Sequence, residues 1–172
     1  MGNILQIDQL AEMREQWRTD GSVTVFTNGH FDLLHVGHLR YLRQAKSLGD
    51  ILIVGINDDA TTTARKGLRR PILPEQERAE LVAGLACVDY AVLFHDPTAN
   101  RLIQSIQPDI YVKGGDYSVS PDEDGTPLPE AATVTAYGGT VRIIPLVEGQ
   151  STSTIEQRII DRWLRYHGHD IH

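Results

Sequence analysis

The chain has 172 residues, of which 41% are hydrophobic and 23% are charged, as in an ordinary globular domain. Its net charge of −7 argues against nonspecific binding to nucleic acid, which requires a basic surface. No stretch is long and apolar enough to cross a membrane, and residues 1–10 lack the pattern of a signal peptide. We therefore expect a cytoplasmic protein without a membrane partner, and its single cysteine, Cys87, excludes an internal disulfide.

Helical and strand patterns alternate along the chain. In chain order, the first half predicts a helix over about 4–18, a strand over 23–27, a helix over 36–48, a strand over 51–56, a polar loop to Pro71 and a helix over 74–85. The second half predicts a strand over 90–94, a helix over 98–106, a strand over 110–113, an exposed loop over 118–128, a helix over about 129–137, a strand over 140–145 and a helix over 151–166.

This alternation predicts an α/β fold with a Rossmann-like, doubly wound, five-stranded parallel sheet. We expect one domain over 1–172, with its core at about 23–162. In such sheets, ligands bind beyond the carboxyl ends of the strands, where the strand order reverses. The segments with unusual composition all follow predicted strands, at 28–38, 57–70, 114–117 and 148–154. They are expected to converge on one crevice.

Cationic side chains are concentrated in two of these segments. Two of the three lysines, Lys66 and Lys113, lie in glycine-containing segments at the ends of predicted strands, and four arginines lie near Lys66 in the sequence: Arg65, Arg69, Arg70 and Arg78. Cations near strand ends in an acidic protein indicate a pocket for a small anion, and solvated surface charges are the alternative. For Arg78, an ion pair with an acid such as Glu75 is favoured over a position in the crevice.

The segment 27–38 carries the clearest chemical pattern, TNGHFDLLHVGH. His35 and His38 are three residues apart at the start of a predicted helix and therefore share one face. Gly37 lets a ligand approach the backbone, and the N–H groups of a helix N-terminus favour an anion. Two imidazoles there can donate hydrogen bonds to phosphate oxygens, where negative charge builds up during phosphoryl transfer.

Other interpretations of this segment are weaker. Half of a metal site is possible, but neither a cysteine nor a third closely placed histidine completes it. The two histidines can also be capping or core residues. The segment lacks the GxGxxG pattern of dinucleotide-binding folds and the GxxxxGK[ST] pattern of P-loops.

The segment GHFDLLHVGH resembles the HxGH signature of the nucleotidyltransferase superfamily, in its cytidylyltransferase-like branch. Four stretches in order, TNGHFDLLHVGHLRYL, NDDATTTARKGLRRP, VKGGDY and GQSTSTI, resemble the adenylyltransferase domain of bacterial ADP-heptose synthases over about 23–162. This resemblance implies transfer of AMP from ATP, with Mg²⁺, to a sugar 1-phosphate, heptose 1-phosphate in that family. The products are an ADP-sugar and pyrophosphate, and a homodimer is plausible by the same resemblance.

The resemblance also implies roles for individual residues. Catalysis would fall to His35, His38 and Lys66. Nucleotide binding would fall to His30 and Phe31, through their backbone, and to Gly37, Gly114, Gly115, Asp116, Ser151, Thr152 and Ser153. Acceptor binding would fall to Asp32, Arg70 and Lys113, with Lys66 and Arg70 contacting phosphate from a flexible loop. No protein side chain is expected to be a dedicated metal ligand.

The sequence departs from the family pattern in three places. His30 stands where heptose-type members commonly carry cysteine, and Leu146 stands where glycerol-phosphate cytidylyltransferases carry arginine, which argues against CTP. The loop 118–128 is longer and more acidic than expected. The alternatives are a cytidylyl- or adenylyltransferase acting on glycerol phosphate, ethanolamine phosphate, flavin mononucleotide or pantetheine phosphate, and a noncatalytic nucleotide-sensing module.

Overall fold

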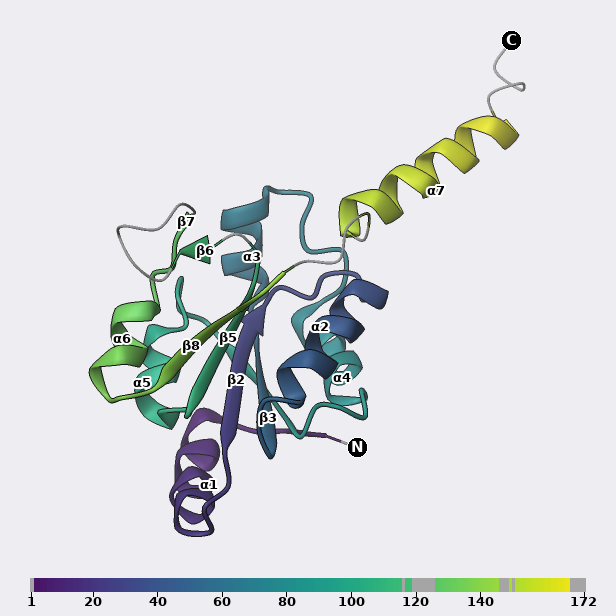
Figure 1. Cartoon of the computed structure of the whole chain (residues 1–172). Helices are drawn as coiled ribbons and strands as arrows, with labels where there is room; N and C mark the ends of the chain where they lie inside the picture. Colours follow the sequence, from purple (N-terminus) through teal and green to yellow (C-terminus); the bar gives the residue numbers. More distant parts are fainter. Residues whose placement is uncertain (1, 116, 119–125, 146–148, 150, 168–172) are drawn as a thin grey trace.

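A parallel sheet of six strands lies at the centre of the computed structural model, which describes residues 2–115, 117–118, 126–145, 149 and 151–167 (Figure 1). The strand order is β1-β4-β3-β2-β5-β8, and every neighbouring pair is parallel. The α/β, Rossmann-like prediction is confirmed, but the predicted number of strands, five, is wrong. The chain winds outward from β2 on one side and returns to its other side at β5, so the strand order reverses between these two strands.

The strands of the large sheet are β1 (Asn3–Ile4), β2 (Thr24–Gly29), β3 (Ile51–Asn57), β4 (Tyr90–Phe94), β5 (Ile110–Gly114) and β8 (Thr140–Ile144). The helices are α1 (Ile7–Thr19), α2 (Val36–Lys46), α3 (Asp59–Lys66), α4 (Glu75–Ala83), α5 (Asn100–Ile106), α6 (Ala131–Ala136) and α7 (Thr152–His167). A separate pair of short strands, β6 (Tyr117–Ser118) and β7 (Thr126–Pro127), lies within the segment predicted as a loop.

Helices cover both faces of the sheet, as Figure 1 shows. Successive side chains of a strand point to opposite faces. Phe26 therefore packs into the core beneath α1, α5 and α6, while its neighbour Val25 packs into the core beneath α2 and α4. Burial of both faces explains why the central strands are almost continuous apolar runs in the sequence.

The additional strand, β1, lies at the edge of the sheet beside β4. Asn3 and Ile4 pair with Tyr90 and Ala91. The approach is close, because a Cβ atom on Gly2 would lie 2.7 Å from the carbonyl oxygen of Val88. Two exposed residues carry no hydrophobic alternation, so the sequence gives no signal for this strand.

Helix α3 occupies a segment predicted as a polar loop. Three consecutive threonines are poor helix formers, but Asp58 caps the helix by accepting a hydrogen bond of 2.7 Å from the N–H of Thr61. Gly67, with φ at +96°, ends it. Lys66 therefore lies in the last turn of a helix, and its predicted place in a flexible loop is wrong.

Helix α7 extends away from the rest of the fold in Figure 1. Several of its large apolar side chains are exposed, with 60% exposure for Ile159 and 51% for Leu164. An ion pair between Glu156, near its N-terminus, and Arg70 holds it to the fold. None of the helices in the described part of the chain combines the length and the hydropathy needed to cross a membrane. The histidine-rich tail, 168–172, lies outside the described residues.

Arg78 of α4 joins the carboxyl ends of β2 and β3. Its side chain is fully buried and donates hydrogen bonds to three backbone carbonyl groups, those of His30, Asn57 at 2.8 Å and Leu73 at 3.0 Å. Its remaining terminal nitrogen pairs with Asp59 at 2.6 Å. The prediction that Arg78 forms an ion pair with an acid and does not line the crevice is confirmed, but the partner is Asp59, because Glu75 accepts the backbone N–H of Asp59 instead.

Replacement of Arg78 by methionine removes the donors from those carbonyl groups and leaves them buried without partners. We expect the free energy of unfolding, measured by urea denaturation, to fall by about 3–5 kcal/mol. Arg78→Lys should recover only part of the loss, since one ammonium group cannot reach all four acceptors. The exposed Arg101→Met should change stability by less than about 0.5 kcal/mol. An equal effect of the two methionine variants would contradict the bridging role.

Candidate functional site

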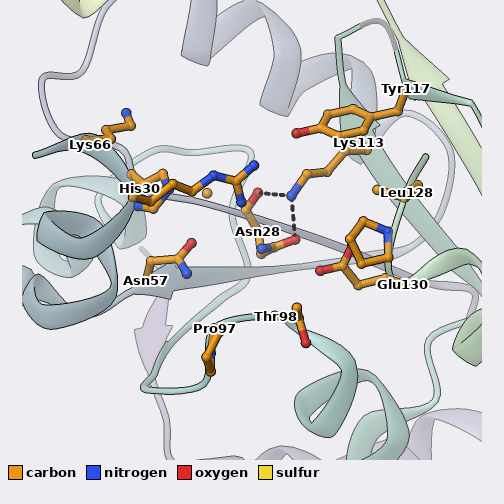
Figure 2. A pocket seen from close by; sticks show the side chains of 13 residues that line it. Asn28, His30, Asn57, Lys66, Pro97, Thr98, Lys113, Tyr117, Leu128 and Glu130 are labelled. Carbon is orange, nitrogen blue, oxygen red and sulfur yellow. Dashed lines mark hydrogen bonds between the residues drawn. The ribbon is translucent and has the colours of Figure 1, made fainter. Parts of the chain in front are cut away.

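A cavity of about 310 Å³ lies at the carboxyl ends of β2, β3, β4 and β5 (Figure 2). Its lining comprises Asn28, Gly29, His30, Asn57, Arg65, Lys66, Pro97, Thr98, Lys113, Tyr117, Leu128, Pro129 and Glu130. Three of the four segments predicted to converge do meet here. The cavity also includes residues that the sequence interpretation missed, after β4 and before α6.

The missed residues had a usable signal in one case. Pro97 and Thr98 follow a strand that was predicted with the correct ends, so the rule that ligands bind beyond strand ends applies to them as well. Glu130 had no such signal. It is buried and accepts the N–H of Ala99 at 3.1 Å, a contact that only the folded chain creates.

Asn28 and Lys113 meet across the point where the strand order reverses. The ammonium group of Lys113 on β5 donates to Oδ1 of Asn28 on β2 at 3.0 Å, and the hydroxyl of Tyr111 donates to the same oxygen at 2.7 Å. Burial lowers the pKa of Lys113 to about 8, against the opposing charge of Glu130. Both strands thus fix a cation at the floor of the cavity.

Further cations lie at the other end of the cavity. At that end, Figure 2 places Lys66 beside His30. Lys113 lies instead beside Tyr117, and the Tyr117 ring centroid is 5.9 Å from the Lys113 ammonium. Lys66 makes no hydrogen bond or ion pair with any residue in the described ranges. Burial and the positive charges of Arg70, Arg65 and Arg78 lower its pKa, while Asp32 opposes the shift. Such a set attracts an anion.

His30 projects into the cavity and is held from behind by α3. Its Nδ1 atom is 2.9 Å from the hydroxyl oxygen of Thr62. Burial is the main cause that lowers its pKa to about 4, followed by the charges of Lys66, Arg65, Arg78 and Lys113. The ring is therefore neutral at physiological pH in the free protein.

The histidine pair lies at the start of α2, next to the cavity but outside its lining. The rings of His35 and His38 are stacked with centroids 3.9 Å apart, and Phe31 packs against His38 at 5.3 Å. Both Nδ1 atoms are buried without a hydrogen-bond partner among the described residues. The two Nε2 atoms are not among these buried atoms without a partner. They are the ring nitrogens that we expect to contact a ligand.

Burial lowers the pKa of both rings. For His38 the pKa falls to about 4, because the charges of His35 and Lys66 add to burial, and the nearby backbone of Leu33 offsets only part of this. Lys66 thus acts on His38 and also lines the cavity. It connects the histidine pair to the anion site.

Asp32 and Arg70 form a buried support beside the pair. The carboxylate of Asp32 accepts from Arg70 at 2.7 Å and from the N–H of Ile72 at 2.6 Å, and Arg70 also pairs with Glu156 of α7. Burial would raise the pKa of Asp32, but these hydrogen bonds and the Arg70 charge hold it below its ordinary value. Direct contact of Asp32 and Arg70 with an acceptor stays a prediction, since both side chains already have partners.

The remaining predicted residues surround this region. Phe31 is buried with φ at +48°, a strained conformation for a residue other than glycine. Gly37 is buried in the first turn of α2, and Gly114 ends β5. Gly115, with φ at +128°, donates its N–H to Ile144. None of these four belongs to the cavity lining.

The segment Ser151–Ser153 begins α7, where the Ser151 hydroxyl accepts the N–H of Thr154 at 3.1 Å. This local bond is that of a helix cap. Neither Ser151, Thr152 nor Ser153 lines the cavity, so their contact with nucleotide stays a prediction. Asp116, Leu146 and residues 119–125 of the acidic loop lie outside the described residues.

The lowered pKa values predict how stability depends on pH. His30 and His38 titrate near 6.5 when unfolded and near 4 when folded, so the unfolded chain binds more protons between these values. We expect the free energy of unfolding to be at its full value above about pH 6.5 and to decrease as the pH falls towards 4.

Urea denaturation across this range measures that slope, and the double variant His30→Gln/His38→Gln should show a shallower one. The carboxyl groups of Asp32 and Asp58 do not produce this slope, because the stability that they contribute is lost only as the pH falls below their unfolded pKa of 3.8. An unchanged slope in the double variant would show that the two imidazoles are not the cause.

The chain is similar to several known proteins. Residues 26–158 match the cytidylyltransferase-like family. The bifunctional protein HldE of Syntrophotalea carbinolica is 46% identical over 160 residues, which is 91% of this chain and 31% of that relative. The bifunctional protein HldE of Pseudomonas aeruginosa strain LESB58 is also 46% identical, over 92% of this chain and 32% of that relative. This chain spans about a third of the length of these curated relatives.

A solved structure is similar as well. The lipopolysaccharide core biosynthesis protein from Thermoplasma volcanium GSS1 shares 31% identity and a TM-score of 0.58, over 76% of this chain and 100% of that one. The family match covers α2 with its histidine pair, every strand from β3 to β8 and α7 up to residue 158. By this match, and by the resemblance carried by its GHFDLLHVGH segment, the chain belongs to the cytidylyltransferase-like family.

Proposed function

We propose that this chain transfers AMP from ATP to a sugar 1-phosphate, with release of pyrophosphate. The observation that carries the proposal is the position of a cation-lined cavity directly beside two stacked imidazoles at a helix N-terminus. An acceptor phosphate fits the cavity, and the triphosphate of ATP fits the start of α2. The two ligands would then meet near Lys66, which lies between them.

The cavity matches a sugar phosphate in both of its chemical parts. Its cations, Arg65, Lys66 and Lys113, suit a phosphate group. Its amide and carboxylate side chains, Asn28, Asn57 and Glu130, suit a polar neutral body rich in hydroxyl groups. Its volume, about 310 Å³, is at the lower end of the range for small-molecule sites.

In the proposed reaction an oxygen of the acceptor phosphate attacks the α-phosphorus of ATP in line. The new P–O bond forms as the bond to pyrophosphate breaks. The attacking oxygen is already anionic, so no general base is required. Positioning and neutralisation of charge supply most of the acceleration.

His35 and His38 stabilise the negative charge that develops on the transferred group and on pyrophosphate. In the free protein, burial keeps both rings largely neutral. A bound triphosphate raises their pKa values, since it places negative charge beside them. Each Nε2 can then donate to a phosphate oxygen, as in other sites that stabilise an oxyanion.

Mg²⁺ fits this site as a complex with ATP. The described residues contain no group of three histidine, cysteine or acidic side chains placed to hold a metal, so phosphate oxygens would supply most ligands. When bound, Mg²⁺ neutralises phosphate charge and fixes the geometry of the chain of phosphates.

The acceptor is proposed from two lines of support. The four sequence stretches resemble heptose-specific adenylyltransferase domains, and the similar solved structure is a lipopolysaccharide core biosynthesis protein. Heptose 1-phosphate is therefore the first candidate acceptor and ATP the first candidate donor. The cytoplasmic location and the homodimer remain expectations.

Replacement of His35 or His38 by alanine removes a donor from the transition state. We expect turnover to fall by about 10²-fold or more, the scale of a lost oxyanion donor, while circular dichroism and the unfolding transition persist. Pyrophosphate release under saturating ATP measures the effect. His95→Ala is the matched control, because its side chain is 73% exposed and lies outside the cavity lining, and it should remain within a few-fold of wild type. Near-normal turnover in His35→Ala and His38→Ala would reject their role.

A substrate panel decides between the acceptors. Pyrophosphate release is measured with heptose 1-phosphate and each of the four common nucleoside triphosphates, then with ATP or CTP and glycerol phosphate, ethanolamine phosphate, flavin mononucleotide or pantetheine phosphate. ATP with heptose 1-phosphate should give the highest kcat/KM. A higher kcat/KM for another pair of substrates would identify that pair as the substrates of the enzyme. ATP binding without pyrophosphate release from any pair would instead support a nucleotide-sensing module.

A further inference from the structure

We propose that His30 is a specificity-determining residue whose Nε2 accepts a hydrogen bond from a hydroxyl group of the sugar phosphate acceptor. This inference rests on the proposed function, because it assigns part of the same cavity to the neutral half of that acceptor. It concerns the side chain of His30, whereas the family resemblance assigns only its backbone.

The proton on the His30 ring is located by a chain of hydrogen bonds. The hydroxyl of Thr62 has a single hydrogen, and it lies 2.7 Å from the backbone carbonyl oxygen of Asp58, which can only accept. Thr62 therefore donates to Asp58. The same hydroxyl oxygen lies 2.9 Å from Nδ1 of His30, so it must accept there, and Nδ1 must carry the hydrogen.

This assignment leaves Nε2 as the free acceptor of a neutral ring. Nε2 makes no hydrogen bond with any described residue, and it is not among the buried atoms that lack a partner. It is thus open to the cavity that His30 lines (Figure 2). Thr62 is completely buried and Asp58 caps α3, so the tautomer is set by a rigid part of the fold.

Burial and the surrounding charges keep the ring in this state. Four cationic side chains act on His30, namely Lys66, Arg65, Arg78 and Lys113, and each disfavours a second proton. The unprotonated Nε2 cannot form a hydrogen bond with a deprotonated phosphate oxygen, because both atoms are acceptors. The phosphate of the acceptor therefore lies with Lys66, Arg65 or Lys113, and an O–H group of its neutral body faces Nε2.

Two substitutions test the assignment by different routes. His30→Leu removes the acceptor but keeps an apolar body, and Thr62→Val removes the oxygen that fixes the tautomer with almost no change of shape. Each should raise KM for the sugar phosphate roughly tenfold, the scale of one hydrogen bond between neutral groups. The affinity for ATP alone, measured by calorimetry, should change less than about twofold. His30→Gln, which offers an amide oxygen, should recover part of the loss.

The matched control is Thr61→Val. Thr61 is the preceding residue of α3, and its hydroxyl bonds Asp58 rather than His30. It should leave KM for the sugar phosphate unchanged. An equal rise in KM for Thr61→Val, or an equal loss of ATP affinity in His30→Leu, would overturn the proposal.

Analogues of the acceptor identify the recognised group. A set of deoxy sugar phosphates, each lacking one hydroxyl, is assayed with wild type and His30→Leu. One analogue should be poor with wild type and no poorer with His30→Leu, because the same hydrogen bond is missing in both. If every analogue loses the same additional factor in the variant, His30 does not contact a hydroxyl.

Long-range ¹H–¹⁵N correlation NMR reads the ring directly and does not depend on activity. At neutral pH it should show a protonated Nδ1 and an unprotonated Nε2, both in the free protein and with sugar phosphate bound. A protonated Nε2 in either state would overturn the assignment. If the spectrum is as expected but no pyrophosphate is released with any sugar phosphate, the proposed function fails while the tautomer stands.

Discussion

Burial of cations around one small cavity, together with their mutual repulsion, is the constraint on which the site depends. Arg65, Lys66 and Lys113 line this cavity, and the pKa of both lysines is lowered. The free protein stores unfavourable electrostatic energy that a phosphorylated ligand relieves on binding. Burial, aided by the same charges, keeps nearby imidazoles neutral until an anion arrives, so binding and protonation are coupled.

Other charged side chains hold the segments around the cavity in place and so offset the cost of gathering cations there. Arg78 supplies donors to the backbone at the ends of β2 and β3, and Asp32 holds Arg70 against the start of α2. These contacts use charged groups as structural supports, whereas Lys66 lines the cavity without a hydrogen-bond partner among the described residues. The supporting groups are buried and the cation that faces a ligand is not: Arg78 and Asp32 are almost fully buried, whereas Lys66 is exposed.

Much of this architecture was predictable because periodicity and strand-end rules depend on local sequence. The strand Tyr90–Phe94 was predicted with its correct ends, and Asn28, Lys66 and Lys113 were placed at one edge. Prediction failed where tertiary contacts decide the outcome. Helix α3 forms despite its threonines because it is capped and packed, and β1 exists only because β4 offers it a partner. For Arg78 the ion pair was predictable, but its acidic partner, Asp59, was not.

The short length of β1 also limits how the edge of the sheet can pair with a strand of another molecule. It pairs with β4 through only two residues, and just beyond it the Leu5 N–H donates a hydrogen bond to the carbonyl oxygen of Ala91. So short an edge gives a foreign strand little to extend. A truncated variant that begins after Leu5 would uncover the edge of β4 at Tyr90 and Ala91, and the backbone groups freed there could pair with a strand of another molecule and lead to aggregation.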